Sequence, residues 1–187
     1  MSKGIIAIKK AFVGTMIKDD KQLGYSKVWA EKFEKANRKL REDKEKQLKD
    51  PLGWQVMLDG NDSLRESIVD EIDEYEALIA HNPNNKIVLQ IDCMDELSDL
   101  LIKARIAFKI TQQELAYLCD FTTEQIKLFE DKDYQNASYL DFLAVANALG
   151  VEIVDGKFIA ELDDFFKQKL AKIRLQNHLD DDMKAAS

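Results

Sequence analysis

The chain has 187 residues, a formal net charge of −8, and only 7 glycines and 2 prolines, a composition that favours helices in one domain or two small ones. Its 2 cysteines cannot form a disulfide framework and its 2 histidines lie far apart, so we expect neither a metal nor a cofactor. The net charge argues against nonspecific nucleic-acid binding, because neutralising phosphates requires clustered Lys and Arg.

The charge is unevenly distributed along the chain. Residues 1–50 hold 14 Lys and Arg against 8 Asp and Glu, a net of +6, whereas residues 51–96 have a net of −9. Residues 97–150 have a net of −3 and residues 151–187 a net of −2. Such asymmetry indicates either that the basic and acidic segments pair with each other or that each has a partner of its own. We favour internal pairing as the simpler interpretation.

The first quarter of the chain predicts one long solvated helix. No apolar run reaches the length of a membrane span or a signal core, so we expect a cytoplasmic protein without a membrane partner. Residues 1–25 show no clear period. From Ser26, a plausible N-cap, apolar residues recur at helical spacing, and residues 50–53 end the pattern with a proline and a glycine.

A second helix is predicted from Ser63, because Ser63 and Glu66 have the spacing of a capping box. The face of this helix opposite its apolar residues is strongly acidic, and we expect this acidic face to lie against the basic helix before it. The loop-forming residues 81–85 end this region. We therefore divide the chain into an N-terminal helical region (1–82), a linker (83–93), a further domain (94–150) and a C-terminal part (151–187). Residues 86–90 fit either a short strand or an extended linker.

Residues 94–150 predict four helices. Thr111 with Glu114, and Thr122 with Gln125, have capping-box spacing, so two short helices are expected at 112–119 and 123–131. Ser138 opens a further helix that Gly150 closes. Two short helices separated by three or four residues are typical of a helix-turn-helix.

These residues also resemble a known family. Four tracts have the order and spacing of the lambda-repressor-like, XRE-type helix-turn-helix domain: residues 101–105 (LIKAR), 110–116 (ITQQELA), 122–130 (TTEQIKLFE) and 143–151 (LAVANALGV). The resemblance implies a mainly α fold and a transcription regulator that binds double-stranded DNA, plausibly as a homodimer on a palindromic site.

The preceding region is similar, more weakly, to HigA-type antitoxins. Residues 17–22 (IKDDKQ) resemble the opening segment of those proteins, and residues 74–76 (EYE) resemble the end of their acidic helix. This resemblance implies that residues 17–80 bind a toxin protein while residues 94–150 repress the operon. It also makes Met16 an alternative start of translation.

In such a domain the second short helix enters the major groove and the first crosses the DNA backbone. Gln112 would contact a phosphate. On the second helix, Thr123 and Glu124 would contact base edges, and Lys127 guanine or phosphate. Lys132 would contact phosphate without regard to sequence. The predicted DNA-binding residues are Gln112, Thr122, Thr123, Glu124, Lys127 and Lys132.

Other residues are expected to support this surface. The resemblance implies a buried ion pair between Arg105 and Glu130, and Ile126, Phe129, Leu115 and Leu118 are expected in the core. Asp120 stands where the family usually has glycine, and aspartate tolerates the left-handed backbone of that turn. The loop 131–136 contains a single basic residue, so we expect modest, salt-sensitive affinity that depends on dimerisation.

The C-terminal part predicts a β-hairpin around Asp155-Gly156, followed by a helix with an apolar stripe that either extends the core or pairs with a second subunit. We favour pairing. No phosphate-binding loop, nucleophile elbow or metalloprotease motif is present in the sequence, so we do not expect an enzyme. The alternative to DNA binding is a helix-turn-helix scaffold that binds only proteins, consistent with the acidic surface.

Overall fold

The structure, a computed structural model, describes residues 16–91, 93–156 and 160–185, with side chains described up to residue 174. Within this part of the chain the fold is all-helical: eight α-helices, one short 3-10 helix and no strand. The expected mainly α class is therefore confirmed. The chain divides into two compact units, of which the first ends at Glu152 and the second begins at Ile153.

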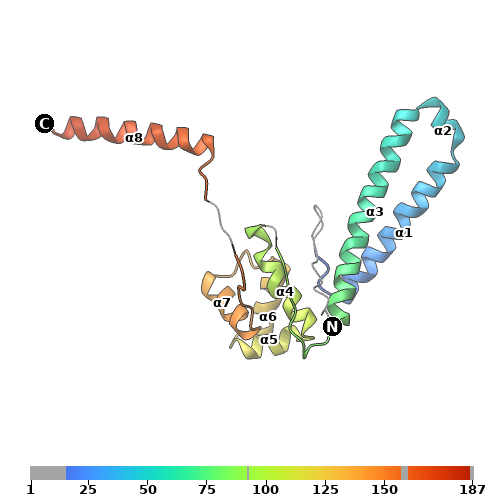
Figure 1. Cartoon of the computed structure of the whole chain (residues 1–187), viewed down its shortest axis with the longest axis horizontal. Helices are drawn as coiled ribbons and strands as arrows, with labels where there is room; N and C mark the ends of the chain where they lie inside the picture. The colour runs from blue at the N-terminus through green and yellow to red at the C-terminus, as the bar shows by residue number, and fades with distance from the viewer. Residues whose placement is uncertain (1–15, 92, 157–159, 186–187) are drawn as a thin grey trace. The chain divides into compact units, whose positions relative to one another are not determined.

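The first unit begins with a helical hairpin, made of α1 (Asp20–Glu42), the short α2 (Lys44–Lys49) and α3 (Pro51–Ala80). Helices α1 and α3 lie side by side (Figure 1). Three ion pairs cross between them. Lys27–Glu76 and Arg41–Asp62 join a base on α1 to an acid on α3, as expected, whereas Glu34–Arg65 has the opposite arrangement. All are partly exposed to solvent, so each contributes little to stability.

The predicted starts of both long helices are wrong. Helix α1 begins six residues before Ser26, because Asp19 is the N-cap and its carboxylate accepts the Gln22 backbone N–H at 2.8 Å. Helix α3 begins at Pro51, where Asp50 is the N-cap, so Ser63 lies inside a continuous helix. Proline at the first helical position lacks only an N–H that would have no partner there, and it therefore opens a helix as readily as it ends one.

The rest of the first unit is a four-helix domain: α4 (Leu97–Ala107), α5 (Gln112–Leu118), α6 (Thr123–Asp131) and α7 (Tyr139–Ala148), preceded by the 3-10 turn Met94–Glu96. The structure confirms the capping boxes at Thr111 and Thr122, and a third at Ser138. Leu115, Ile126 and Phe129 are buried, as predicted. Leu118 is 55% exposed, which contradicts its predicted core position. It is the last residue of a seven-residue helix.

Three features connect the hairpin to the four-helix domain. Residues 86–90 form an extended linker without a strand, and Ile87 and Leu89 pack against the core. A buried ion pair joins Glu74 of α3 to Lys103 of α4. Residues 16–18, which precede α1, bury Met16 and Ile17 in the same core. Residues 1–15 lie outside the described part of the chain, and with them the proposed N-terminal extension.

The second unit contains α8 (Asp164–Ala185). Residues 151–156 form no strand, so the first half of the expected hairpin is wrong, while residues 157–159 lie outside the described residues. Phe165, Phe166 and Ile173 of α8 are exposed within this unit rather than forming a core. Among the described helices, none combines the length and the apolar character needed to cross a membrane.

Candidate nucleic-acid interface

The two short helices α5 and α6 are held in a defined arrangement by the turn between them. Residues 119–122 form this turn, and Asp120 adopts the left-handed backbone with φ 57°, which aspartate tolerates better than most residues. The turn is closed by a hydrogen bond from the Phe121 N–H to the Ala116 carbonyl at 2.9 Å. The left-handed conformation was expected from the family resemblance, in which glycine usually occupies the position of Asp120.

Helix α6 presents its N-terminal side to solvent. Glu124 and Lys127 are exposed and Thr123 is half-buried. The hydroxyl of Thr122 accepts the Gln125 backbone N–H at 3.1 Å, and the Gln125 side chain accepts the Thr122 N–H at 2.9 Å. The Thr122 hydroxyl therefore caps α6, and any contact with DNA would be a second role of this side chain. The three predicted base-contacting side chains, Thr123, Glu124 and Lys127, thus lie on one side of α6 within its first five residues.

Sequence reasoning missed one residue of this surface. Leu128 is 51% exposed and follows Glu124 by four residues, so the two side chains lie on the same side of α6. Leu128 was given no role from the sequence. The signal that would have found it is its register, because Ile126 and Phe129 already occupy the buried side of this short helix. An apolar side chain here is suited to a thymine methyl group.

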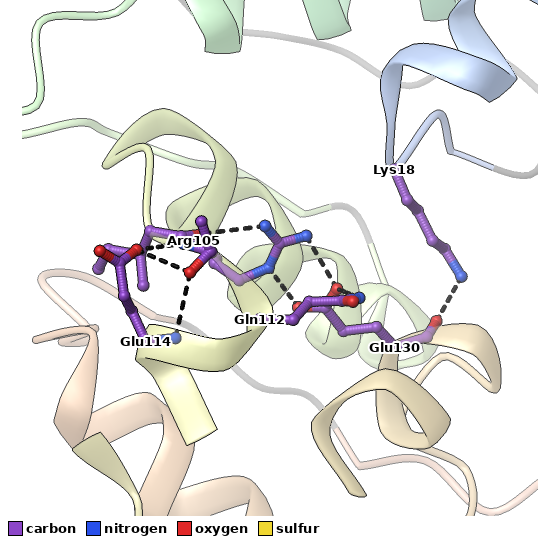
Figure 2. Close-up of polar contacts among 7 residues, drawn as sticks. Lys18, Arg105, Gln112, Glu114 and Glu130 are labelled. Atoms are coloured by element: carbon purple, nitrogen blue, oxygen red, sulfur yellow. Dashed lines mark hydrogen bonds and ion pairs between the residues drawn. The ribbon is translucent and has the colours of Figure 1, made fainter. Parts of the chain in front are cut away.

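The buried ion pair between Arg105 of α4 and Glu130 of α6 supports α6 from beneath. Figure 2 shows the fork of the guanidinium facing the carboxylate, with Nε–Oε1 at 2.5 Å and a second hydrogen bond to Oε2 at 2.8 Å. A further N–H of Arg105 reaches the Ile110 carbonyl at 3.0 Å. Since Glu130 is 1% exposed, this bidentate pair is a buried contact that fixes α6 on α4.

Gln112 lies against this ion pair. Its amide donates a hydrogen bond to Glu130 Oε2 at 2.8 Å (Figure 2), and it borders a polar pocket of about 250 Å³ shared with Lys18 and Gln22. An amide nitrogen carries two hydrogens, so the bond to Glu130 orients the group and leaves the second hydrogen for another acceptor. Gln112 is the first residue of α5, and its side-chain amide is held in place by Glu130. The hydrogen bond to Glu130 was not predicted from the sequence.

The loop after α6 is tightly turned. Lys132 ends the helix and is exposed, and the next two residues, Asp133 and Tyr134, both have positive φ, at 48° and 56°. This conformation is unusual for tyrosine. It is held because Tyr134 is buried between the rings of Phe129 and Phe142, with centroids 5.8 and 6.1 Å away. Burial raises the pKa of the Tyr134 hydroxyl far above its usual range.

The charges around the exposed side of α6 are mixed. Lys127 and Lys132 are exposed, but so are the acidic side chains of Asp120, Glu124 and Asp131. Such a surface does not neutralise many phosphates, and its affinity for DNA would depend on specific contacts more than on net charge.

Two further side chains in this domain have shifted pKa values. Hydrogen bonds from the Thr111 backbone N–H and then from its hydroxyl lower the pKa of Glu114, which closes the capping box of α5. Burial, with a smaller contribution from the charge of Asp120, raises the pKa of the Cys119 thiol, which disfavours the thiolate. Across the described residues, no group of His, Cys, Asp or Glu side chains could hold a metal ion.

Comparisons of the chain with protein-family models, with curated proteins and with solved structures found no match.

Proposed function

We propose that this protein is a sequence-specific DNA-binding transcription regulator, in which α5 and α6 form a lambda-repressor-like helix-turn-helix. The observation that carries the proposal is the first half of α6, where Glu124 and Lys127 are exposed beside the half-buried Thr123. The Arg105–Glu130 pair holds this helix on α4. A short helix with free polar side chains at its N-terminal end has the form that enters a major groove.

The proposal gives each side chain a role. Thr123 contacts a base edge or a thymine methyl, Glu124 accepts from cytosine N4, and Lys127 donates to guanine or to phosphate. The Gln112 amide, oriented by Glu130 at 2.8 Å, uses its second hydrogen on a phosphate oxygen, and Lys132 contacts the backbone at the other end of α6. The protein acts in the cytoplasm, without a cofactor and without catalysis.

The experiment is a selection of bound sequences from randomised DNA duplexes, followed by affinity measurements on the selected duplex over a range of salt concentrations. We expect one preferred sequence and an affinity that falls as the salt concentration rises. Folded protein that retains no duplex even at low salt would overturn the proposal.

Single substitutions separate base contacts from phosphate contacts. Thr123→Ala or Glu124→Ala should change the preference at one base pair by about 1–3 kcal/mol, whereas Lys132→Ala should weaken all duplexes alike and reduce the salt slope by about 1. Lys35→Ala on α1 is a matched control, because Lys35 is exposed and pairs only with Glu31 on its own helix. It should change neither quantity.

A second candidate function is binding to another protein, either as a scaffold without DNA binding or as an antitoxin. The observation that favours it is a group of large exposed apolar side chains within one turn of α1, namely Tyr25, Val28 and Trp29, which are 60%, 50% and 51% exposed. Exposed apolar patches mark interaction sites.

The DNA-binding proposal also predicts a homodimer, because two copies double the number of phosphate contacts. Sedimentation over a range of concentrations tests whether two copies associate.

A further inference from the structure

The segment before α1 is bound to the far end of α6, more than a hundred residues away in the sequence. The ammonium group of Lys18 donates to the Glu130 carbonyl at 2.5 Å and pairs with Asp133 Oδ1 at 2.7 Å. Figure 2 shows Lys18 extending from the N-terminal segment toward Glu130. Its side chain is only 13% exposed. A lysine with this degree of burial occupies a defined position rather than a solvated one.

The residues beside Lys18 explain why it is held there. Ile17 and Met16 are buried in the core of the first unit, which fixes the backbone on one side. On the other side, the Gln22 side chain accepts the Lys18 backbone N–H at 2.9 Å while the Gln22 N–H donates to Asp19. The segment 16–18 is thus anchored in the core at one end and to the first turn of α1 at the other.

The two contacts of Lys18 span the turn that ends α6. The Glu130 carbonyl belongs to the last turn of the helix, and Asp133 is the first of the two residues with positive φ. Carbonyl groups at a helix end carry partial negative charge and favour a cation. Non-glycine residues with positive φ are strained and persist only where surrounding contacts hold them. Lys18 is one of those contacts.

We propose that Lys18 is a positioning residue for the DNA-binding surface: it holds the turn at Asp133 and Tyr134, and thereby the placement of Lys132 at the end of α6. The effect on DNA binding rests on the proposed function. The contacts of Lys18 with Glu130 and Asp133 lie within the first unit and do not depend on what that unit binds. The segment 16–18 leads directly into α1 and also contacts the end of α6 through Lys18. A ligand that displaces this segment would therefore alter the end of α6.

The first test does not involve DNA. The Asp133 and Tyr134 backbone N–H groups donate to the Glu130 and Phe129 carbonyls, at 3.2 and 2.7 Å, so their hydrogen exchange reports on the turn. Lys18→Met keeps the aliphatic stem and removes the charge, and these two amides should exchange about tenfold faster. Lys21→Met removes an exposed charge three residues along and should leave them unchanged. Asp133→Asn retains a residue suited to positive φ, an amide oxygen for Lys18 and the Lys18 contact with the Glu130 carbonyl, so it should accelerate exchange less than Lys18→Met does.

The second test measures DNA binding on the selected duplex. If Lys18 acts through the placement of Lys132, Lys18→Met weakens all duplexes by a similar factor, about three- to tenfold, lowers the salt slope by at most about 1, and leaves the base preference unchanged. The same substitution in a Lys132→Ala background should then lower neither the affinity nor the salt slope further. A further fall of the slope by about 1 in that background would mean that Lys18 contacts phosphate itself, which overturns the positioning role. Unchanged exchange of the two amides would overturn the inference outright. Failure of the wild-type chain to bind DNA would contradict the proposed function, while the exchange experiment would still decide on the contact.

Discussion

The hairpin and the four-helix domain are both helical, but they are stabilised differently. The four-helix domain consists of short helices of 7 to 11 residues, which surround a buried core and a buried ion pair. The hairpin contains helices of 23 and 30 residues, which bury a few apolar side chains such as Ala30 and Leu58 and one polar cluster, and are joined elsewhere by exposed ion pairs. Short helices are marginal in isolation, so each depends on its caps and its packing. Single substitutions in the interior of the four-helix domain should therefore lower its stability strongly. Most substitutions on the surface of the hairpin should change stability little.

The largest effect is expected from breaking the ion pair of the four-helix domain. Glu130→Ala leaves the Arg105 guanidinium buried without its carboxylate, so the free energy of unfolding should fall by about 3–5 kcal/mol. Chemical denaturation measures the change. Glu124→Ala is the matched control on the same helix, where an exposed carboxylate should be worth less than about 0.5 kcal/mol. Equal effects of the two substitutions would show that α6 is not held by this pair.

A smaller effect is expected in the hairpin, at its buried polar cluster. Asn37 is buried, and its amide donates to the Leu58 carbonyl at 3.1 Å and to Asp62 at 2.6 Å, while Asn61 donates to its oxygen at 2.8 Å. Asn37→Ala leaves these groups without that partner and should cost about 1–3 kcal/mol.

The measurement for Asn37→Ala is hydrogen exchange resolved along the chain. Faster exchange should be confined mainly to amides of α1 and α3, with α5 and α6 still protected, because Asn37 contacts only the hairpin. Uniform loss of protection in both regions would show that the two are one cooperative unit and would remove the distinction drawn between them.

The two regions also differ in how far the sequence predicted them. For α5, α6 and α7 the start of each helix was predicted, because Thr111, Thr122 and Ser138 are caps whose partners lie three residues away. The left-handed backbone of Asp120 was expected instead from the family resemblance, in which glycine usually stands at this position, and Asp120 has φ 57°. Local hydrogen bonds can be inferred from local sequence.

The hairpin was predicted less well because its signals are ambiguous. Ser63 and Glu66 have the spacing of a cap but lie inside α3, where the backbone groups are already paired within the helix. Asp50 and Pro51 were taken for a helix end, and Asp19 with Gln22 was noticed only as a family resemblance, although these two residues start α1. Contacts between distant residues, such as Lys18 with Glu130, have no signature in spacing at all.

The smallest expected effect concerns pH and the cap of α5. Because the folded-state pKa of Glu114 lies below its usual value of 4.5, its ionised form stabilises the fold above that pH, and this contribution is lost as the pH falls through the folded-state pKa. Glu114→Gln keeps an acceptor for Thr111 but does not titrate. Denaturation from neutral to acidic pH should show a shallower loss of stability in the Gln variant than in the wild type. Parallel profiles would mean that Glu114 does not close the cap.

The central claim is that the exposed side of α6, and not the hairpin, determines which DNA sequence is bound. The most direct measurement is the selection profile from randomised duplexes for three proteins: the wild type, Glu124→Ala on α6 and Trp29→Ala on α1. The account predicts one preferred sequence for the wild type, an altered preference at one base pair for Glu124→Ala, and the wild-type profile for Trp29→Ala. An unchanged profile for Glu124→Ala together with an altered one for Trp29→Ala, or no selected sequence from folded wild-type protein, would contradict it.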